Sequence, residues 1–558
     1  MNVTKIFSDR KHLGIGTEIF TRRQTDILSA ALILMVTVAI SRVLGLVRAR
    51  LLASQFTPDL IDVYIAAFRL PDIIFNLLIF GTLSVAFIPV FTEISQKKGP
   101  EQAWKLAAAV INLIMLAFLL LGVVAFVFAP VFSRLIAPGL LPDHFILMTN
   151  LSRIMLVGQL LLVISSFFVG INQSFQRFLV PAIASVFYNV GIIAGILFLS
   201  GEIGIYGAAV GVVAGAFLHL VIQLPLILSL GFSWSPIFSL KTPGVSKIIR
   251  LVLPRSLSLA MEQINELVSV QLASLIAAGS ITFLTFAQYL YLAPVGLFGA
   301  TIAQAALPVL ANHRVQDDIN QFKKTLLTSF HHILFLVLPL AMVLIILRIP
   351  LVRLVFGASP KFDWIATVQT GQAVAAFSIG LAAVAVNQLL IRAFYALQDT
   401  KTPVVISIVA VAANVGISVL SVFVWHLPVW GLGMAATAAA IVQTALLLVL
   451  LDRSLGTFDR GQLFIPAIKM LTAAVIAAVV LYMPMKFLDQ LVFDTTKTIN
   501  LLLLTSIATF FGLGTYGGLT WLFKVEEIRL FWKIIDRIKS MKLTAPQTPE
   551  IASQPGQN

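Results

Sequence analysis

The sequence predicts an all-α, polytopic membrane protein with about 14 transmembrane helices. Of its 558 residues, 59% are hydrophobic and only 11% are charged, and the mean hydropathy is +0.99. A soluble domain is only about 45 to 50% apolar. Runs of roughly 20 apolar residues, the length at which a helix crosses ~30 Å of hydrocarbon, recur along the chain. The composition therefore excludes an ordinary soluble domain.

Fourteen apolar runs are separated by short loops. They cover residues 27–56, 61–93, 104–133, 147–174, 179–200, 205–231, 246–278, 281–311, 325–350, 365–396, 403–425, 430–451, 464–484 and 499–523. Lysine and arginine gather in alternate loops, for example Lys97 and Lys98 after the second run and Lys241 and Lys247 after the sixth. The positive-inside rule then places both termini in the cytoplasm. The net charge of +14 thus reflects the Lys and Arg residues of the cytoplasmic loops. We therefore expect no nucleic-acid partner.

The chain also repeats itself. Phe87-Ile88-Pro89 is echoed by Ala306-Leu307-Pro308, roughly 220 residues later. Because each unit holds an even number of spans, the repeats are parallel. We expect two six-helix lobes, 27–231 and 246–453, followed by two further helices in 464–523. Parallel repeats typically place their site at the interface between lobes, near the membrane midplane.

The two ends of the chain are polar. Residues 1–26 form a cytoplasmic segment, and the apolar run after them shows no cleavage site, so we expect the first helix to be retained. Residues 525–540 alternate apolar and charged positions as an interfacial amphipathic helix does. Residues 541–558, rich in Pro, Gln and Ser, are expected to be disordered.

Arginines inside the first apolar run are the most unusual feature. Arg42 stands about 15 residues into the run, ~22 Å deep, where a cation is costly. Gly45 permits a bend that brings Arg42 and Arg48 onto one cavity. Arg50 points elsewhere and is expected to reach the lipid headgroups. For Arg42 and Arg48 we favour a role in binding substrate over structural ion pairing.

Charges also mark the seventh run. Arg255, Glu262 and Glu266 fall within roughly 20° of one line on a helix. Two carboxylates one turn apart repel by roughly 3 kcal/mol at an effective dielectric near 20. Glu262 and Glu266 are therefore either an ion- or proton-coupling site or fixed partners of arginines on neighbouring helices.

Other polar positions have simpler interpretations. Asp62 in the second run either faces the cavity or is a structural partner, and Arg69 and Asp72 are structural partners or helix-end anchors. His331 and His332 are expected to form a helix-surface pair near an interface rather than a metal site, since no acidic residue stands at metal-ligand spacing. We expect no metal and no catalytic residue. With no cysteine, the chain has neither a disulfide nor a thiolate site. Glycines in 207–215 lie inside an apolar helix and favour close helix packing over phosphate binding.

Several of these residues resemble the signature of the MurJ/MviN family of lipid II flippases. The motif Ser41-Arg42-Val43-Leu44-Gly45 with Arg48, the string Ala67-Phe68-Arg69-Leu70-Pro71, and the tripeptide Gln263-Ile264-Asn265 all match. The most specific match is the twelve-residue string from Arg392 to Pro403. The resemblance extends over essentially the whole chain.

The resemblance implies a transporter and no enzyme. The fold would be the 14-helix fold of the multidrug/oligosaccharidyl-lipid/polysaccharide exporter superfamily, with the last two helices forming a groove for the lipid tail. The substrate would be lipid II or a similar polyprenyl-pyrophosphate glycan, flipped across the bacterial cytoplasmic membrane by alternating access for cell-wall synthesis. The protein would be a monomer among membrane lipids without cofactors, coupled to the membrane potential or to a sodium or proton gradient.

The sequence also departs from the family pattern. Members usually carry further cavity arginines in the second and eighth helices and a glutamate after the former, where this chain has Phe75, Tyr289 and Phe80. Arg255 and Arg392 are candidate replacements. The alternatives are therefore an exporter of another lipid-linked oligosaccharide or polysaccharide, or a drug/cation antiporter of the same superfamily.

Overall fold

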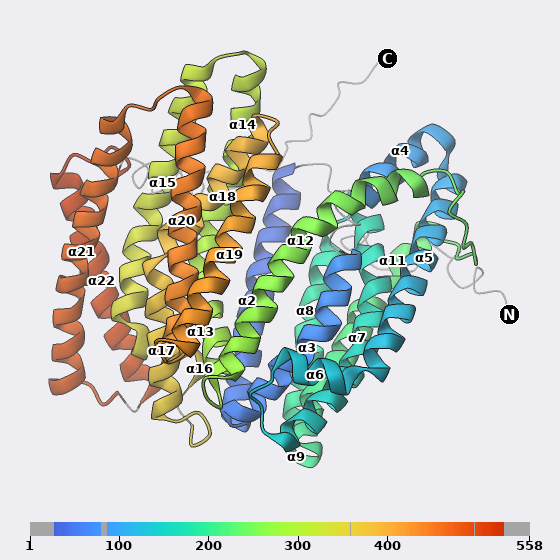
Figure 1. The fold of residues 1–558 in the computed structure, drawn as a ribbon, viewed down its shortest axis with the longest axis horizontal. Helices are drawn as coiled ribbons and strands as arrows, with labels where there is room; N and C mark the ends of the chain where they lie inside the picture. Colours follow the sequence, from blue (N-terminus) through green and yellow to red (C-terminus); the bar gives the residue numbers. More distant parts are fainter. Residues whose placement is uncertain (1–26, 80–85, 358, 496, 529–558) are drawn as a thin grey trace, which may run out of the picture. The chain divides into compact units, whose positions relative to one another are not determined.

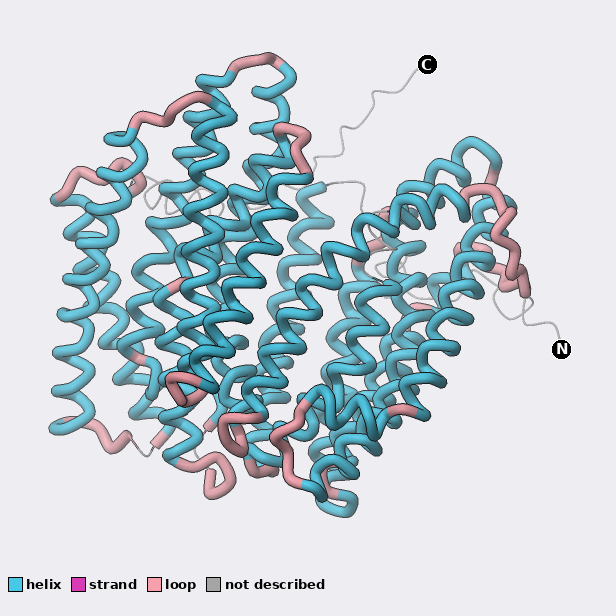
Figure 2. The backbone as a smooth tube through the Cα atoms, viewed as in Figure 1, coloured by secondary structure: helices cyan, strands magenta, loops and turns pink. Residues whose placement is uncertain are grey.

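The computed structural model describes residues 27–79, 86–357, 359–495 and 497–528, and within them every regular element is a helix (Figure 1, Figure 2). The first half contains α2 (Ile27–Gln55), α3 (Pro58–Ile79), α4 (Ile88–Lys98), α5 (Pro100–Val127), α6 (Ala129–Ile136), α7 (Pro142–Ser174), α8 (Leu179–Ala194), η3 (Gly195–Leu199), α9 (Ser200–Ile203), α10 (Tyr206–Val221), α11 (Leu224–Ser229) and α12 (Val245–Ser274). The second half contains α13 (Ser280–Pro294), η4 (Val295–Ala300), α14 (Thr301–Val315), α15 (Ile319–Ile346), α16 (Arg348–Phe356), α17 (Trp364–Ile379), α18 (Leu381–Ala396), α19 (Lys401–Phe423), α20 (Trp430–Leu455), α21 (Arg460–Leu491) and α22 (Thr498–Leu522). The all-α fold is confirmed. In hydrocarbon, a helix satisfies every backbone hydrogen bond within its own segment.

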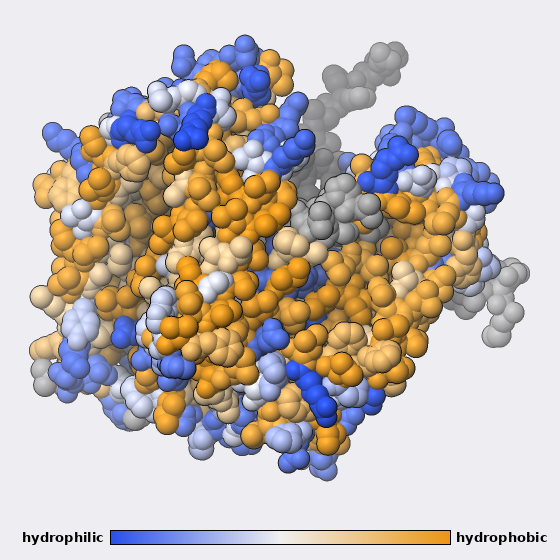
Figure 3. Space-filling model, viewed as in Figure 1, coloured by the Kyte–Doolittle hydropathy of each residue, from blue (hydrophilic) through white to orange (hydrophobic). Residues whose placement is uncertain are grey.

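Within the described residues, ten helices are long and apolar enough to cross a membrane, and α17 with α18, bent by 45°, makes an eleventh span. These spans correspond to eleven of the fourteen expected runs. The remaining three runs contain α2, α3 followed by α4, and α12, and each of these runs carries charged residues. Apolar side chains cover the visible helix flanks, and polar ones gather at the helix ends (Figure 3). The chain is a multi-pass membrane protein, and within the described residues α2, α3 and α12 each carry several charged side chains.

The helices form two compact units. One unit holds the described residues up to Tyr291, together with Arg348–Phe377 and Val404–Ala439, and the other holds Leu292–Leu347, Ser378–Pro403 and the described residues from Ala440 on. The boundaries of the expected lobes and the tail groove stay predictions. Residues 1–26 and 541–558 lie outside the described residues. Of the expected amphipathic helix only residues 525–528 are described.

In the first unit, glycines bring α8, η3 and α10 into close contact. A Cβ on Gly191 would stand 2.3 Å from the Gly215 Cα, and one on Gly195 would stand 2.5 Å from the Gly211 Cα. Such approaches require small residues on both helices. The interpretation of these glycines as packing residues is confirmed.

We expect Gly191→Leu to destabilise the protein by about 3 kcal/mol or more, because overpacking alone costs 1–3 kcal/mol and here the obstacle is backbone. The measurement is thermal unfolding of the purified protein in detergent. Gly514→Leu is the matched control, since nothing lies within 4 Å of a Cβ at Gly514 in α22. Equal unfolding temperatures for the two variants would contradict this assignment.

The second unit is centred on α15, which packs against α14, α18 and α21. His331 on α15 is only 6% exposed, and its Nε2 lies 3.1 Å from the Leu463 carbonyl of α21. The expected surface position of His331 is therefore wrong, because α21 packs over this face of α15. Among the described residues, no group of three or more His, Cys, Asp or Glu is arranged to hold a metal.

Acidic side chains cap several helices. Asp459 accepts from the backbone N–H of Gly461 at 2.8 Å at the start of α21, and Asp318 accepts from that of Gln321 at 3.0 Å at the start of α15. In the loop before α19, hydrogen bonds from Thr402 and Lys401 lower the pKa of Asp399. The stabilisation from this cap is present above the ordinary carboxyl pKa of about 4 and is lost as the pH falls below it.

Candidate functional site

Arg48 on α2 stands among tyrosines in the first unit. It is half-buried, interacts electrostatically with Tyr64 on α3 and Tyr188 on α8, and shares a hydrogen bond with Tyr289 on α13. Tyr289 thus occupies a position where the family resemblance implies an arginine, and its hydroxyl contacts an arginine from another helix. Arg48 forms no ion pair with any described residue. Phenol oxygens can accept from the guanidinium without neutralising its charge.

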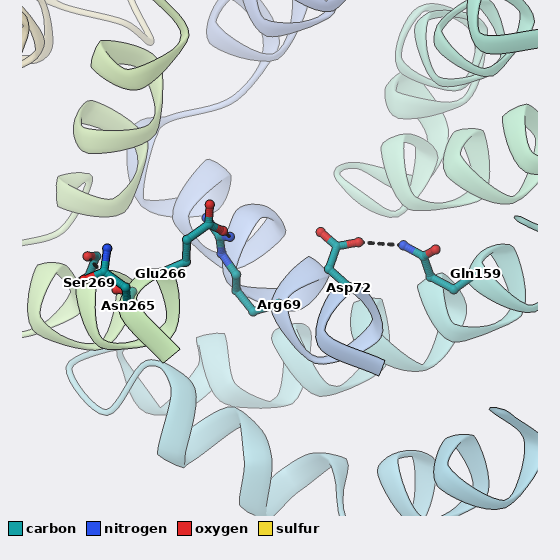
Figure 4. Close-up of polar contacts among 6 residues, drawn as sticks. All are labelled: Arg69, Asp72, Gln159, Asn265, Glu266 and Ser269. Atoms are coloured by element: carbon teal, nitrogen blue, oxygen red, sulfur yellow. Dashed lines mark hydrogen bonds and ion pairs between the residues drawn. The ribbon is translucent and has the colours of Figure 1, made fainter. Parts of the chain in front are cut away.

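A second arginine is held by a carboxylate. Arg69 on α3 forms an ion pair with Glu266 on α12, and their side chains are 17% and 52% exposed, respectively. Three residues along α3, Asp72 accepts a hydrogen bond of 2.6 Å from Gln159 on α7. Figure 4 shows Arg69 reaching toward Glu266 while Asp72 faces Gln159. Two charges three residues apart on one helix therefore serve different neighbours.

The two arginines belong to one electrostatic network, because Asp72 interacts with Arg69, Glu266 and Arg48. When Arg48, Arg69, Asp72 and Glu266 are all ionised, the two positive and two negative formal charges of this network cancel. Within the described residues, the buried Tyr64 hydroxyl oxygen, Arg69 Nε and Gln159 Oε1 have no hydrogen-bond partner. Buried polar atoms are rarely left unpaired. The network therefore offers unused donors and acceptors to a polar group entering between these helices.

Arg42 and Arg50 have different surroundings. Arg42 is exposed and makes no hydrogen bond or ion pair within the described part of the chain. Arg50 donates at 2.6 Å to the carbonyl of Leu354, in the last turn of α16, and its expected position at the headgroups stays a prediction. A cation suits a helix C-terminus, where carbonyls lack partners. Arg50 therefore fastens α16 to α2.

Asp62 is enclosed by hydrogen bonds. Its carboxylate accepts from the backbone N–H groups of Gly279 and Thr282 at 2.7 Å each and from the Thr282 hydroxyl at 2.6 Å. The side chain is 1% exposed. It caps the amino end of α13, where backbone N–H groups need acceptors. These contacts favour the structural interpretation of Asp62, and a substrate role stays a prediction.

The acidic stripe of α12 is only partly described. Glu266 pairs with Arg69, as expected of a fixed partner on a neighbouring helix, and Glu262 one turn earlier is exposed. The side chain of Arg255 lies outside the described part of the chain. Arg392 belongs to α18 in the second unit and donates to the Gln388 carbonyl at 3.0 Å. The binding and coupling roles of these residues stay predictions.

Arg69 and Asp72 have structural partners on neighbouring helices, as expected, but their connection to Arg48 was not predicted. Both stand in an apolar helix three residues apart, a spacing that puts them on adjacent parts of one face. That spacing was the available signal. The tyrosines around Arg48 carried no comparable signal, since isolated aromatic residues are common in membrane helices.

A model of the family described as "Lipid II flippase MurJ" matches residues 52–515. The chain belongs to this family. The lipid II flippase MurJ of Burkholderia cenocepacia is 28% identical over 66% of this chain and 73% of its own length. The probable lipid II flippase MurJ of Buchnera aphidicola is 28% identical over 87% of this chain and 94% of its own length. The resemblance inferred from the motifs is confirmed.

Solved structures show the same fold. A MurJ lipid II flippase in an inward closed conformation superposes with a TM-score of 0.71 at 21% identity, covering 87% of this chain and 98% of its own. An inward-facing MATE multidrug resistance transporter of the MOP superfamily gives a TM-score of 0.63 at 14% identity, over 76% and 98%. The MurJ fold of this chain is thus shared with the wider superfamily.

Proposed function

We propose that this protein flips lipid II, the undecaprenyl-pyrophosphate-linked peptidoglycan precursor, from the inner to the outer leaflet of the cytoplasmic membrane. Membership of the MurJ family supports transport of a lipid-linked substrate. The observation that carries the proposal is Arg48, a half-buried guanidinium in a membrane helix that forms no ion pair with a described residue. A cation inside a membrane helix is costly unless it meets an anion.

The pyrophosphate supplies such an anion. A guanidinium presents forked donors that match phosphate oxygens, so Arg48 and Arg42 are the proposed ligands. Tyr289 orients Arg48 through their hydrogen bond. Arg69 is a third candidate, released to the substrate when Glu266 exchanges its partner. Asp62, Arg255 and Arg392 remain weaker candidates for substrate contact.

Transport would proceed by alternating access, since the sugar and peptide head cannot cross hydrocarbon unassisted. The lipid tail would stay in the bilayer, guided by α21 and α22, which pack together. Both termini are proposed to be cytoplasmic, as the loop cations indicate. The driving force would be the membrane potential or a sodium or proton gradient, acting on Glu262 and Glu266. A monomer is sufficient for this scheme.

We expect Glu262→Gln to change the pH or sodium dependence of transport while leaving the protein folded, because the amide keeps the shape of the side chain and removes its charge. The measurement is the initial flipping rate in proteoliposomes over a range of pH and sodium concentration. Glu101→Gln is the control, since Glu101 pairs with Lys105 at an exposed position of α5. A profile that matches wild type would leave Glu262 with a structural role.

The substrate itself is tested by identifying the lipid that copurifies. Mass spectrometry of protein extracted in mild detergent should find lipid II enriched over bulk phospholipid, and less of it with Arg48→Ala. Enrichment of another lipid-linked glycan would favour that alternative. A protein that copurifies with no polyprenyl lipid and transports organic cations would instead be a drug/cation antiporter.

A further inference from the structure

An apolar pocket in the first unit takes no part in the proposed transport site. Its volume is about 450 Å³, and it lies between α5, α7 and the loop that joins α11 to α12. The side chains that define its walls are Met115 and Leu119 of α5, Ile164 and Phe168 of α7, and Trp234 and Phe238 of the loop. Its lining offers a ligand hydrocarbon contacts and almost no polar group.

Asn112 builds this pocket by fixing the loop against α5. Its Nδ2 donates to the carbonyls of Ser235 at 2.8 Å and Ile237 at 3.1 Å, and its Oδ1 accepts from the Trp234 indole N–H at 3.0 Å. Asn112 is 4% exposed. A buried amide that satisfies three hydrogen bonds from one loop is a specific clamp. The three hydrogen bonds of Asn112 therefore fix the loop in the position that forms the pocket.

The pocket has the depth of one lipid leaflet. It runs along α5 from Ile111 to Leu119, about 12 Å at 1.5 Å per residue, against the ~15 Å of hydrocarbon in one leaflet. Trp234 and Phe238 are 62% and 55% exposed, as expected of aromatic residues at a membrane interface. A single acyl chain fits this depth, whereas a polyprenyl tail is too long for it.

Cations stand on the headgroup side of the pocket. Lys105 precedes Ile111 by six residues on α5 and is 47% exposed, and Lys241 follows Phe238 by three residues and is exposed. Glu101 pairs with Lys105 at 2.7 Å and is itself 80% exposed, so this pair can open. The cation-rich loop belongs on the cytoplasmic side. Charge and depth together fit an anionic phospholipid of the inner leaflet.

We propose that this pocket binds one acyl chain of an anionic phospholipid, which supports the loop that leads into α12. The loop ends at α12, which carries Glu266, the partner of Arg69. A bound chain would hold the cytoplasmic end of α12 in place by filling the space beneath Trp234. The pocket would then make transport sensitive to the lipid composition of the membrane.

The test is photo-crosslinking in vesicles of phosphatidylethanolamine and phosphatidylglycerol, with phosphatidylglycerol carrying a diazirine on one acyl chain. Peptide mapping should find label on Met115, Leu119 or Phe168. Ile164→Trp fills the pocket, and we expect it to reduce this label roughly tenfold, as the loss of a few buried methylenes would. Leu120→Trp is the matched control, because Leu120 of α5 is 62% exposed.

Three outcomes would overturn the proposal. Label spread evenly over the exposed faces of α5, unchanged by Ile164→Trp, would mean ordinary contact with bulk lipid. Stronger label from a diazirine-bearing polyprenyl phosphate would mean that the pocket binds the polyprenyl tail of the transported lipid. Equal label from phosphatidylcholine carrying the same diazirine would mean that the pocket does not prefer an anionic headgroup. Asn112→Leu gives a second arm: it removes the three hydrogen bonds to the loop, so it should loosen the loop and reduce label at Phe168 while the apolar side chains of the lining stay unchanged. These results are independent of lipid II transport.

Discussion

Replacing Arg48 by alanine is expected to abolish growth in cells that depend on this protein as their only lipid II flippase. The guanidinium is the proposed ligand of the pyrophosphate, and alanine leaves neither charge nor donor in its place. Losing hydrogen bonds to a charged group costs about 1.5–3 kcal/mol per bond, so two bonds lower binding of the headgroup by at least 100-fold. Complementation on depletion of the resident flippase measures this.

Controls separate binding from folding. The variant should reach the membrane at the wild-type level and unfold at only a slightly lower temperature, because it loses one hydrogen bond, to Tyr289, and no ion pair with a described residue. Arg48→Lys should recover only part of the activity, because an ammonium lacks the forked geometry. Arg134→Ala, at an exposed position of α6, should complement fully. Undiminished growth with Arg48→Ala would remove Arg48 from the binding site, and Arg42→Ala tests its companion in the same cells.

The second large effect is expected at the pair of Arg69 and Glu266. Arg69→Ala should stop transport and also destabilise the protein by about 1 kcal/mol, a modest figure because Glu266 is half-exposed. Glu266→Gln should destabilise by a similar amount while keeping measurable transport, since Arg69 remains available to the substrate. Flipping rates and thermal unfolding of the purified variants provide both readouts.

The double variant decides between the two roles of this pair. If the pair only holds α3 against α12, Arg69→Ala with Glu266→Gln should be no less stable than either single variant and should transport as well as Glu266→Gln does. If Arg69 also binds substrate, the double variant should have the same stability but should not transport. Transport by the double variant at the Glu266→Gln rate would return Arg69 to a purely structural role.

The fold could be predicted from the sequence because the membrane imposes it. An apolar run of about 20 residues has one stable backbone arrangement in hydrocarbon, so composition and run length were enough. The same reasoning identified α2 and α12 as the unusual spans, because cations and carboxylates in hydrocarbon need a cause. The motif from Arg392 to Pro403 then indicated the family.

Partners of the charged residues could not be predicted in the same way. Helical periodicity gives the face on which Glu266 lies, but Arg69 stands 197 residues earlier in the chain. Likewise, the groups that enclose Asp62 lie 217 and 220 residues later. The carbonyl that accepts from Arg50 belongs to Leu354, 304 residues later in the chain. Such contacts depend on which helices pack together, and this packing cannot be predicted from the local sequence pattern.

The most direct test of the account is transbilayer movement of lipid II by the purified protein. Proteoliposomes loaded with lipid II bearing a fluorophore on its peptide are treated with a membrane-impermeant quencher, and the protected fraction is followed over time. The account predicts that wild-type protein exposes the protected lipid II, that Arg48→Ala does not, and that a fluorescent phosphatidylcholine stays protected in both. The assay is repeated under an imposed membrane potential, a sodium gradient and a proton gradient. The account would be contradicted if, under all of these conditions, lipid II moved no faster than in protein-free vesicles.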